Sequence, residues 1–274
     1  LVAQTHLAMM KFHNKVCEML REKGLKESEI FPEARRIVTW HFQHIVLHDW
    51  VERLCGEGTV SRILKEGRKF YRFKTRPYMP VEFSVAAYRL GHSMVRQTYS
   101  FNAVFEDADF SLLFGFTGQS GQILGDRAAD VSGDGPFPVR SLPSNWIIDW
   151  RRFHELEKPK NIPRNPSRRL DPLLVDELHT LPNGGGDLAE RNLKRGVKMG
   201  LPSGQDVAAE MGVENPLSPD EIANGPDGQI AEKHGLHKAT PLWYYILKEA
   251  QVREDGKRLG AVGATIVAET LVGL

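Results

Sequence analysis

Two groups of residues in this sequence have the types and the spacing to do chemistry together. Arg89 and His92 are three positions apart, so on a helix they share one face. Side chains on a helix lean toward its N-terminus, so a planar anion held by Arg89 would lie close to whatever His92 contacts. Gly91, beside the histidine, lets a bulky group approach the backbone. This spacing would suit a bulky ligand with an acidic group.

The second group lies on a predicted helix that Asp187 caps and that ends near Gly200. Leu188, Asn192 and Arg195 fall at i, i+4 and i+7, which places an apolar side chain, an amide and a guanidinium on one face. This trio is unusual for a core stripe and suits a cofactor with an apolar face, a hydrogen-bonding ligand and an acidic edge. On residue types alone, a lone histidine on an apolar helix is more often a hydrogen-bonded core residue than a ligand.

Helices are needed to position these residues, and the sequence predicts many. The helix predicted over 81–96 follows Pro80, which fits a first turn. Its apolar residues recur at helical spacing and are Ala86, Ala87, Leu90 and Met94. Further helices are predicted over 1–23, 27–54, within 57–79, from Trp146, over 173–181, after the capping residues Ser203, Ser218 and Thr240, and from Gly260. Residues 99–145 are glycine-rich and predict a loop region.

Alternating strand patterns are scarce among these segments. We therefore predict a mainly α, single-domain fold of many helices with few or no strands. His41, His44 and His48 fall on one face of the helix over 27–54, which leaves two interpretations: a metal-binding stripe, or a polar seam against a neighbouring helix. Two cysteines, Cys17 and Cys55, are too few for a disulfide framework.

Composition excludes some classes of function. The chain has 274 residues and a formal net charge of +1, which gives no electrostatic footprint for nucleic acid or a membrane surface. No apolar run reaches the roughly 18 residues that a membrane-spanning helix needs. No signal peptide is visible, so the sequence does not decide between a secreted and a cytoplasmic protein. Because the chain starts at Leu1 inside a helical pattern, we expect a fragment of a longer protein or one chain of a processed one.

Several segments resemble one known family. The run Tyr-Arg-Leu-Gly-His-Ser-Met-Val at 88–95 resembles the proximal-histidine helix of the animal-type haem peroxidases, the superfamily of myeloperoxidase, peroxidasin and cyclooxygenase. In order along the chain, segments 11–15, 34–56, 146–153, 171–182, 240–250 and 258–263 also resemble family motifs. The pattern of tryptophans, aspartate and phenylalanine at 146–153 is similar to that of bacterial members, so we expect a bacterial protein.

The resemblance implies a role for each of the chemical residues. His92 would be the axial ligand of haem iron, and Asn192 would accept the second N–H of its imidazole through the side-chain oxygen. Arg89 and Arg195 would lie near the haem propionates. The remaining cofactor-binding residues would pack on or near the ring and are Tyr88 and Leu188. The implied cofactor is haem b, held between central helices.

The resemblance also implies an activity, which is the reduction of hydrogen peroxide with oxidation of an unidentified small-molecule donor. In the family, the distal histidine and arginine and the calcium loop belong to segments that would precede Leu1. Residues 1–274 would thus be the C-terminal, proximal part of one peroxidase domain, with an N-terminal segment or chain as partner. Gln43 and His48 have the wrong spacing to be the distal pair, so His48 is not expected to be catalytic.

Three alternatives stay open. A cyclooxygenase-like fatty-acid dioxygenase would need a radical-forming tyrosine near the haem, for which Tyr99, Tyr244 and Tyr245 are candidates. A non-catalytic haem-binding module would lack the distal residues altogether. An all-helical scaffold with no cofactor would need none of these roles.

Overall fold

The computed structural model describes residues 2–109, 112, 147–156, 162–181 and 184–274. Helices dominate this part of the chain, and its strands form a single two-stranded ribbon, so the prediction of a mainly α fold is confirmed. The chain divides into two compact units. The first comprises Leu1–Ser93, Arg169–Leu173 and Asn192–Leu274, and the second comprises Met94–Arg168 and Leu174–Arg191.

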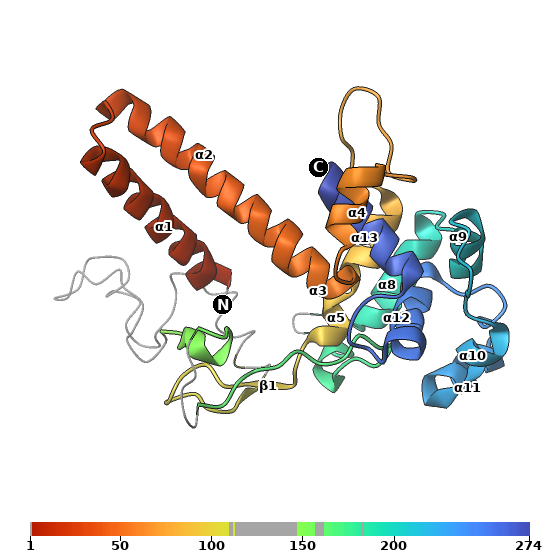
Figure 1. Ribbon diagram of the computed structural model, residues 1–274. Coiled ribbons are helices and arrows are strands. Elements are labelled where there is room, and N and C mark those ends of the chain that lie inside the picture. Colours follow the sequence, from red (N-terminus) through yellow and green to blue (C-terminus); the bar gives the residue numbers. More distant parts are fainter. Residues whose placement is uncertain (1, 110–111, 113–146, 157–161, 182–183) are drawn as a thin grey trace. The chain divides into compact units, whose positions relative to one another are not determined.

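The first unit begins with a helical hairpin. Helices α1 (Val2–Glu22) and α2 (Glu27–Ile45) lie side by side and antiparallel (Figure 1). The chain reverses at Gly24, whose φ of +83° suits glycine. Four buried apolar residues hold the hairpin together: Val16, Leu20, Ile30 and Ala34. Large apolar side chains elsewhere on the two helices are each at least 43% exposed: Leu7, Met10, Met19, Phe31, Trp40, Phe42 and Ile45.

The helix predicted over 27–54 is present. It consists of three consecutive helical segments that differ in pitch. After α2, a π-helical segment covers Val46–Val51, and α3 covers Glu52–Cys55. The last of these segments ends at Gly56, which has a φ of +99°. Helix α4 (Thr59–Glu66) follows, and Glu52 Oε1 accepts the backbone N–H of Val60 near its start at 2.9 Å.

The prediction of one regular helix over 81–96 is wrong. A π-helical segment covers Glu82–Ala86, a 3-10 turn covers Ala87–Arg89, and the short helix α5 covers Gly91–Met94. The change of pitch falls at Ala86, where φ is −121° and ψ is −73°. Segments 82–86 and 87–89 both pack against the central helices α12 and α13, so tertiary packing prevails over the local helical pattern.

The remaining helices lie between residue 188 and the C-terminus, and several begin at predicted capping residues. The helices are α8 (Leu188–Lys198), α9 (Gly204–Glu210), α10 (Pro219–Ala223), α11 (Gly225–Lys233), α12 (Leu242–Glu254) and α13 (Ala261–Gly273). Helix α8 begins in the second unit and continues into the first, and the others belong to the first unit. The Ser203 hydroxyl accepts the Asp206 N–H, and Ser218 forms a capping box with Glu221, so both predicted caps are confirmed. The third predicted capping residue is Thr240. In the structure Pro241 instead occupies the N-cap position of α12, and no side chain caps this helix.

Helices α12 and α13 form the buried centre of this unit. Both carry mostly buried side chains, including two carboxylates that act as backbone acceptors. Glu249 of α12 accepts the Val262 N–H at the start of α13 at 3.0 Å. Glu269 of α13 accepts N–H groups from the loop after α4, at Lys69, Phe70 and Tyr71. These carboxylates tie the central helices to each other and to the segment that precedes residue 82.

The second unit contains little regular structure among its described residues. Strands β1 (Thr98–Tyr99) and β2 (Ala108–Asp109) pair antiparallel. In place of the helices predicted from Trp146 and over 173–181, the described residues show 3-10 turns at Trp150–Arg152 and Asp176–Leu178. Asp149, and Asp171 in the 169–173 segment of the first unit, each accept the backbone N–H two residues on, a local bond that competes with helix formation. Trp146 itself and most of the glycine-rich loop lie outside the described residues.

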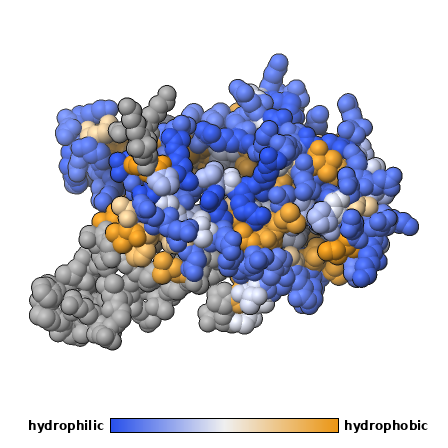
Figure 2. Space-filling model, turned by 90° about the horizontal axis from the view of Figure 1, so that it is seen from below, coloured by the Kyte–Doolittle hydropathy of each residue, from blue (hydrophilic) through white to orange (hydrophobic). Residues whose placement is uncertain are grey.

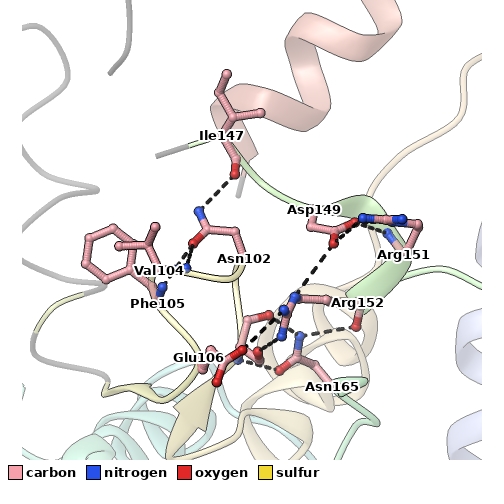
Figure 3. A network of polar contacts seen from close by, with 10 residues as sticks. Asn102, Val104, Phe105, Glu106, Ile147, Asp149, Arg151, Arg152 and Asn165 are labelled. Carbon is pink, nitrogen blue, oxygen red and sulfur yellow. Dashed lines mark hydrogen bonds and ion pairs between the residues drawn. The ribbon is translucent and has the colours of Figure 1, made fainter. Parts of the chain in front are cut away.

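A polar network holds this unit together (Figure 3). Arg152 is 4% exposed, donates to the Ser100 hydroxyl and lies 3.7 Å from the Glu106 carboxylate. The Asn165 side chain accepts the Ser100 N–H and donates to the Ser100 and Arg152 carbonyls. Asn102 accepts two N–H groups and donates to the Ile147 carbonyl. Side-chain bonds thus replace regular secondary structure here.

The described residues on one face of the molecule are predominantly polar (Figure 2). Figure 2 shows hydrophilic residues over most of the described surface in that view, with hydrophobic residues in separate patches. Among the described helices, none has both the length and the apolar character to cross a membrane. Cys17 and Cys55 are both free thiols.

Candidate functional site

His92 and Asn192 meet in the structure although one hundred positions separate them. The Asn192 Nδ2 atom lies 2.9 Å from His92 Nδ1. Asn192 is 2% exposed, so its amide is held in place by the surrounding helices, whereas His92 is half-buried. The other face of the imidazole, at Nε2, is therefore the one available to a ligand.

Arg89 completes a three-residue arrangement. Its Nη1 donates to Asn192 Oδ1 at 3.3 Å, and its Nε donates to the Ser84 carbonyl at 3.2 Å. Because the Asn192 amide oxygen accepts this hydrogen bond from Arg89, the amide nitrogen faces His92. The sequence-based expectation had the oxygen facing the imidazole. A rotation of the Asn192 amide by 180° about its last side-chain torsion would exchange the positions of its oxygen and nitrogen and would leave the shape of the side chain nearly unchanged.

The surroundings of His92 favour the neutral form of its imidazole. Burial lowers the pKa of His92, and the positive charge of Arg89 lowers that pKa further. A neutral imidazole offers a lone pair to a metal, whereas the protonated form does not. The electrostatics of this corner therefore favour the state of His92 that can act as a ligand.

Space is available beside the histidine. A Cβ atom built on Gly91 would have no described atom within 4 Å, apart from its immediate chain neighbours. Tyr88 is 48% exposed and stacks on Phe83 with ring centroids 4.5 Å apart. Its ring is also 5.6 Å from that of Trp50. The edge of a site for a large planar group would have these features: a half-buried His92, free space at Gly91 and the exposed ring of Tyr88.

Helix α8 carries the other predicted site residues. Leu188 lies four residues before Asn192 and is half-buried, and Arg195 lies three residues after Asn192 and is exposed. Asp187 caps this helix, because its Oδ1 accepts the Glu190 N–H at 2.9 Å. The predicted cap and the predicted helix are therefore both confirmed.

The histidine stripe on α2 does not form a three-ligand metal site. His41, His44 and His48 are all exposed, and His41 Nδ1 lies 2.8 Å from the Ile37 carbonyl. The His44 and His48 rings are 4.6 Å apart. Across the described ranges, no three side chains of His, Cys, Asp or Glu come close enough together to hold a metal ion.

The tyrosines considered as radical sites have structural partners. The Tyr244 hydroxyl donates to Asp227 Oδ2 at 2.7 Å, and burial is the main cause of its raised pKa. The fully buried Tyr245 hydroxyl accepts the Leu217 N–H at 3.0 Å. In the second unit, the Tyr99 hydroxyl accepts the Arg96 N–H.

Sequence reasoning missed two neighbours of the site. Trp50 flanks Tyr88 from a segment nearly forty residues away, and no local pattern connects the two. The Ser84 carbonyl, which holds Arg89, becomes an acceptor only because the backbone leaves regular α-helical geometry there. Neither contact has a signal in the spacing of residue types.

Comparison with known proteins gives a consistent result. The family model of the animal haem peroxidases matches residues 1–114, the region that contains Arg89 and His92. The chorion peroxidase of Drosophila melanogaster is 27% identical over 274 residues, covering 96% of this chain and 31% of that protein. Peroxidasin homolog pxn-2 of Caenorhabditis elegans is 27% identical over 201 residues, covering 72% of this chain and 14% of that protein.

A third relative comes from a mollusc. The peroxidase-like protein of Margaritifera margaritifera is 27% identical over 225 residues, covering 72% of this chain and 25% of that protein. The chain thus spans less than a third of the length of each of these curated relatives. The family model matched by residues 1–114 and these peroxidase relatives support the resemblance of this chain to the animal haem peroxidase superfamily.

Proposed function

We propose that this chain forms the proximal side of the haem site in a peroxidase that reduces hydrogen peroxide with electrons from a small-molecule donor. The observation that carries the proposal is the 2.9 Å approach of Asn192 Nδ2 to His92 Nδ1, in a chain whose residues 1–114 match the animal haem peroxidase model. The whole of residues 1–274 would then be the C-terminal, proximal part of one peroxidase domain.

His92 would ligate the haem iron through Nε2. Its half-buried position, its lowered pKa and the open space at Gly91 support this role. Asn192 is the proposed partner of Nδ1. A metal-bound Nε2 requires the proton to be on Nδ1, so the amide must then present its oxygen to the imidazole. A neutral amide would leave the imidazole less anionic than a carboxylate would, and this sets the reactivity of the metal.

Arg89 and Arg195 are the proposed partners of the haem propionates. A propionate left unpaired in a partly buried site would cost several kcal/mol. Arg89 would exchange its bond with Asn192 Oδ1 for a propionate, and this exchange frees the oxygen for His92. Leu188 and Tyr88 are the proposed apolar contacts of the macrocycle, here taken as haem b.

The chemistry supplied by haem is the reduction of hydrogen peroxide by iron. In this proposal the chain's own contribution is to ligate the metal, fix the imidazole and neutralise the acidic edge. The groups that handle the peroxide itself are proposed to come from an N-terminal segment or chain. The exposed apolar side chains of α1 and α2, among them Phe31 at 63% and Trp40 at 58%, support a partner surface there.

Haem titration tests the proposal. Wild-type protein should bind one haem with a Soret band typical of histidine ligation, and His92→Ala should lose that band while retaining its helical circular dichroism. His234→Ala is the matched control, because His234 is an exposed histidine at the end of α11. Equal haem spectra in wild type and His92→Ala would exclude His92 as the ligand.

A further inference from the structure

A second cavity lies within the first unit, and none of the residues that line it belongs to the proposed haem site. Its volume is about 470 Å³, within the range of small-molecule sites. The walls come from the loop after α4 and the segment that follows it, from α9 and its flanks, and from the C-terminal half of α13. The lining residues used below are Phe70, Tyr71, Tyr78, Glu82, Asp206 and Glu210.

Aromatic rings form one wall of this cavity. The Tyr71 and Tyr78 rings are 5.3 Å apart, and the Tyr71 hydroxyl donates to the Tyr78 carbonyl at 2.8 Å. Phe70 and Tyr78 are 39% and 51% exposed, so their rings are accessible. The backbone of this wall is fixed, because Glu269 accepts the N–H groups of both Phe70 and Tyr71. The rings are therefore held in place before any ligand arrives.

All of the charged residues that line the cavity are acidic. Glu82, Asp206, Glu210 and Glu269 line it, and none of the lining residues is cationic. Glu269 is satisfied by backbone N–H groups, and Asp206 accepts the Ser203 hydroxyl at 2.6 Å. For Glu82 and Glu210, the described part of the chain provides no ion-pair partner. Glu82 and Glu210 therefore lie beside the exposed rings of Phe70 and Tyr78. The Arg68 guanidinium lies over the buried Tyr71 ring, 5.4 Å from its centroid, and is not among the lining residues.

We propose that this cavity binds an organic cation, namely a protonated amine carried on an aromatic or aliphatic body. Carboxylates attract the ammonium group, and the exposed rings of Phe70 and Tyr78 attract it through cation–π interactions. The remaining apolar lining, including Val207, Met211 and Ile266, accommodates the body. A neutral molecule would lack the electrostatic part of this recognition, and an anion would be repelled.

Three isosteric indoles test the proposal by titration calorimetry on the full chain. Tryptamine carries a positive charge at neutral pH, tryptophol is uncharged and indole-3-propionate is negative. Tryptamine should bind at least about tenfold more tightly than tryptophol, and indole-3-propionate should bind most weakly. Added salt should weaken tryptamine binding more than tryptophol binding. Equal affinity for tryptamine and tryptophol, as expected of a merely apolar docking surface, overturns the proposal, and so does the absence of binding.

Variants locate the binding. Glu82→Gln and Glu210→Gln should each weaken tryptamine binding about threefold, the size expected for a partly exposed charge pair. Glu214→Gln is the matched control, because Glu214 is exposed and lies outside the cavity lining, and it should leave the affinity unchanged. Unchanged tryptamine affinity in the Glu82→Gln, Glu210→Gln double variant overturns the assignment. All of these measurements are made without haem, so their outcome is independent of the haem proposal.

Discussion

Arg89 donates a hydrogen bond to Asn192 Oδ1 at 3.3 Å, and the nitrogen of the same amide lies 2.9 Å from His92. One guanidinium thereby sets both the orientation of the amide and the electrostatic environment of the imidazole. Burial is the larger cause of the lowered pKa of His92, and the positive charge of Arg89 is the smaller one.

The first prediction concerns the pKa of His92. Arg89→Gln removes the neighbouring positive charge, so the pKa should rise toward the ordinary value of 6.5 but stay below it, because the imidazole remains partly buried. NMR titration of the haem-free protein measures this directly. Arg195→Gln is the control and should leave the His92 pKa unchanged. A pKa that falls in Arg89→Gln would contradict the electrostatic account.

The second prediction concerns the tuning of the metal by Asn192. Asn192→Asp should make the imidazole more anionic and lower the reduction potential of bound haem, and Asn192→Ala should keep haem but change its potential. Spectroelectrochemistry provides the measurement, with the exposed Asn14→Ala as control. Identical potentials in wild type and both Asn192 variants would show that the amide is not the partner of the imidazole.

The third prediction concerns stability against pH. Burial raises the pKa of Glu249 from 4.5 to about 7, so the folded protein holds this proton more tightly than the unfolded chain. Its contribution is fully present below pH 4.5 and is lost as the pH rises through 7. The free energy of unfolding should therefore fall by about 3 kcal/mol across this window because of Glu249 alone.

Urea denaturation at several pH values, compared between wild type and Glu249→Gln, isolates that contribution. The variant should lack the fall in stability between pH 4.5 and 7, because its amide does not titrate. Glu232→Gln, at an exposed position on α11, should behave like wild type. The same pH dependence in Glu249→Gln as in wild type would rule out Glu249 as its source.

The fourth prediction concerns a buried ion pair. Lys248 is 2% exposed and donates to Asp227 Oδ2 at 2.9 Å, joining α12 to α11. Lys248→Met should destabilise the protein by about 3–5 kcal/mol, because it leaves the buried Asp227 carboxylate without its cation and with the Tyr244 hydroxyl as its remaining side-chain donor. Lys15→Met breaks the exposed pair with Glu18 and should cost less than about 1 kcal/mol. Equal losses in urea denaturation would mean that burial does not control the strength of these pairs.

Local features of the fold were predictable from sequence because their causes are local. The Ser203, Ser218 and Asp187 caps depend on hydrogen bonds within a single turn, and all three are present. The region 173–181 shows the limit of this reasoning. Asp171 followed by proline is typical of a helix start, but the Asp171 carboxylate instead closes a turn onto the Leu173 N–H.

Features that depend on distant segments were not predictable from residue spacing. The irregular backbone at 82–89 results from packing on α12 and α13, which lie more than 150 residues further along the chain. The approach of His92 to Asn192 was expected only through resemblance to a family, since no local pattern links the two helices. The acidic cavity went unnoticed because its walls come from three separate parts of the sequence.

The central claim is that the imidazole of His92 ligates haem iron, and resonance Raman spectroscopy of the ferrous protein tests it most directly. Wild-type protein should show an iron–histidine stretching band that His92→Gly lacks and that added imidazole restores, because the small side chain leaves room for a free ligand. A band that persists in His92→Gly without imidazole would contradict the account.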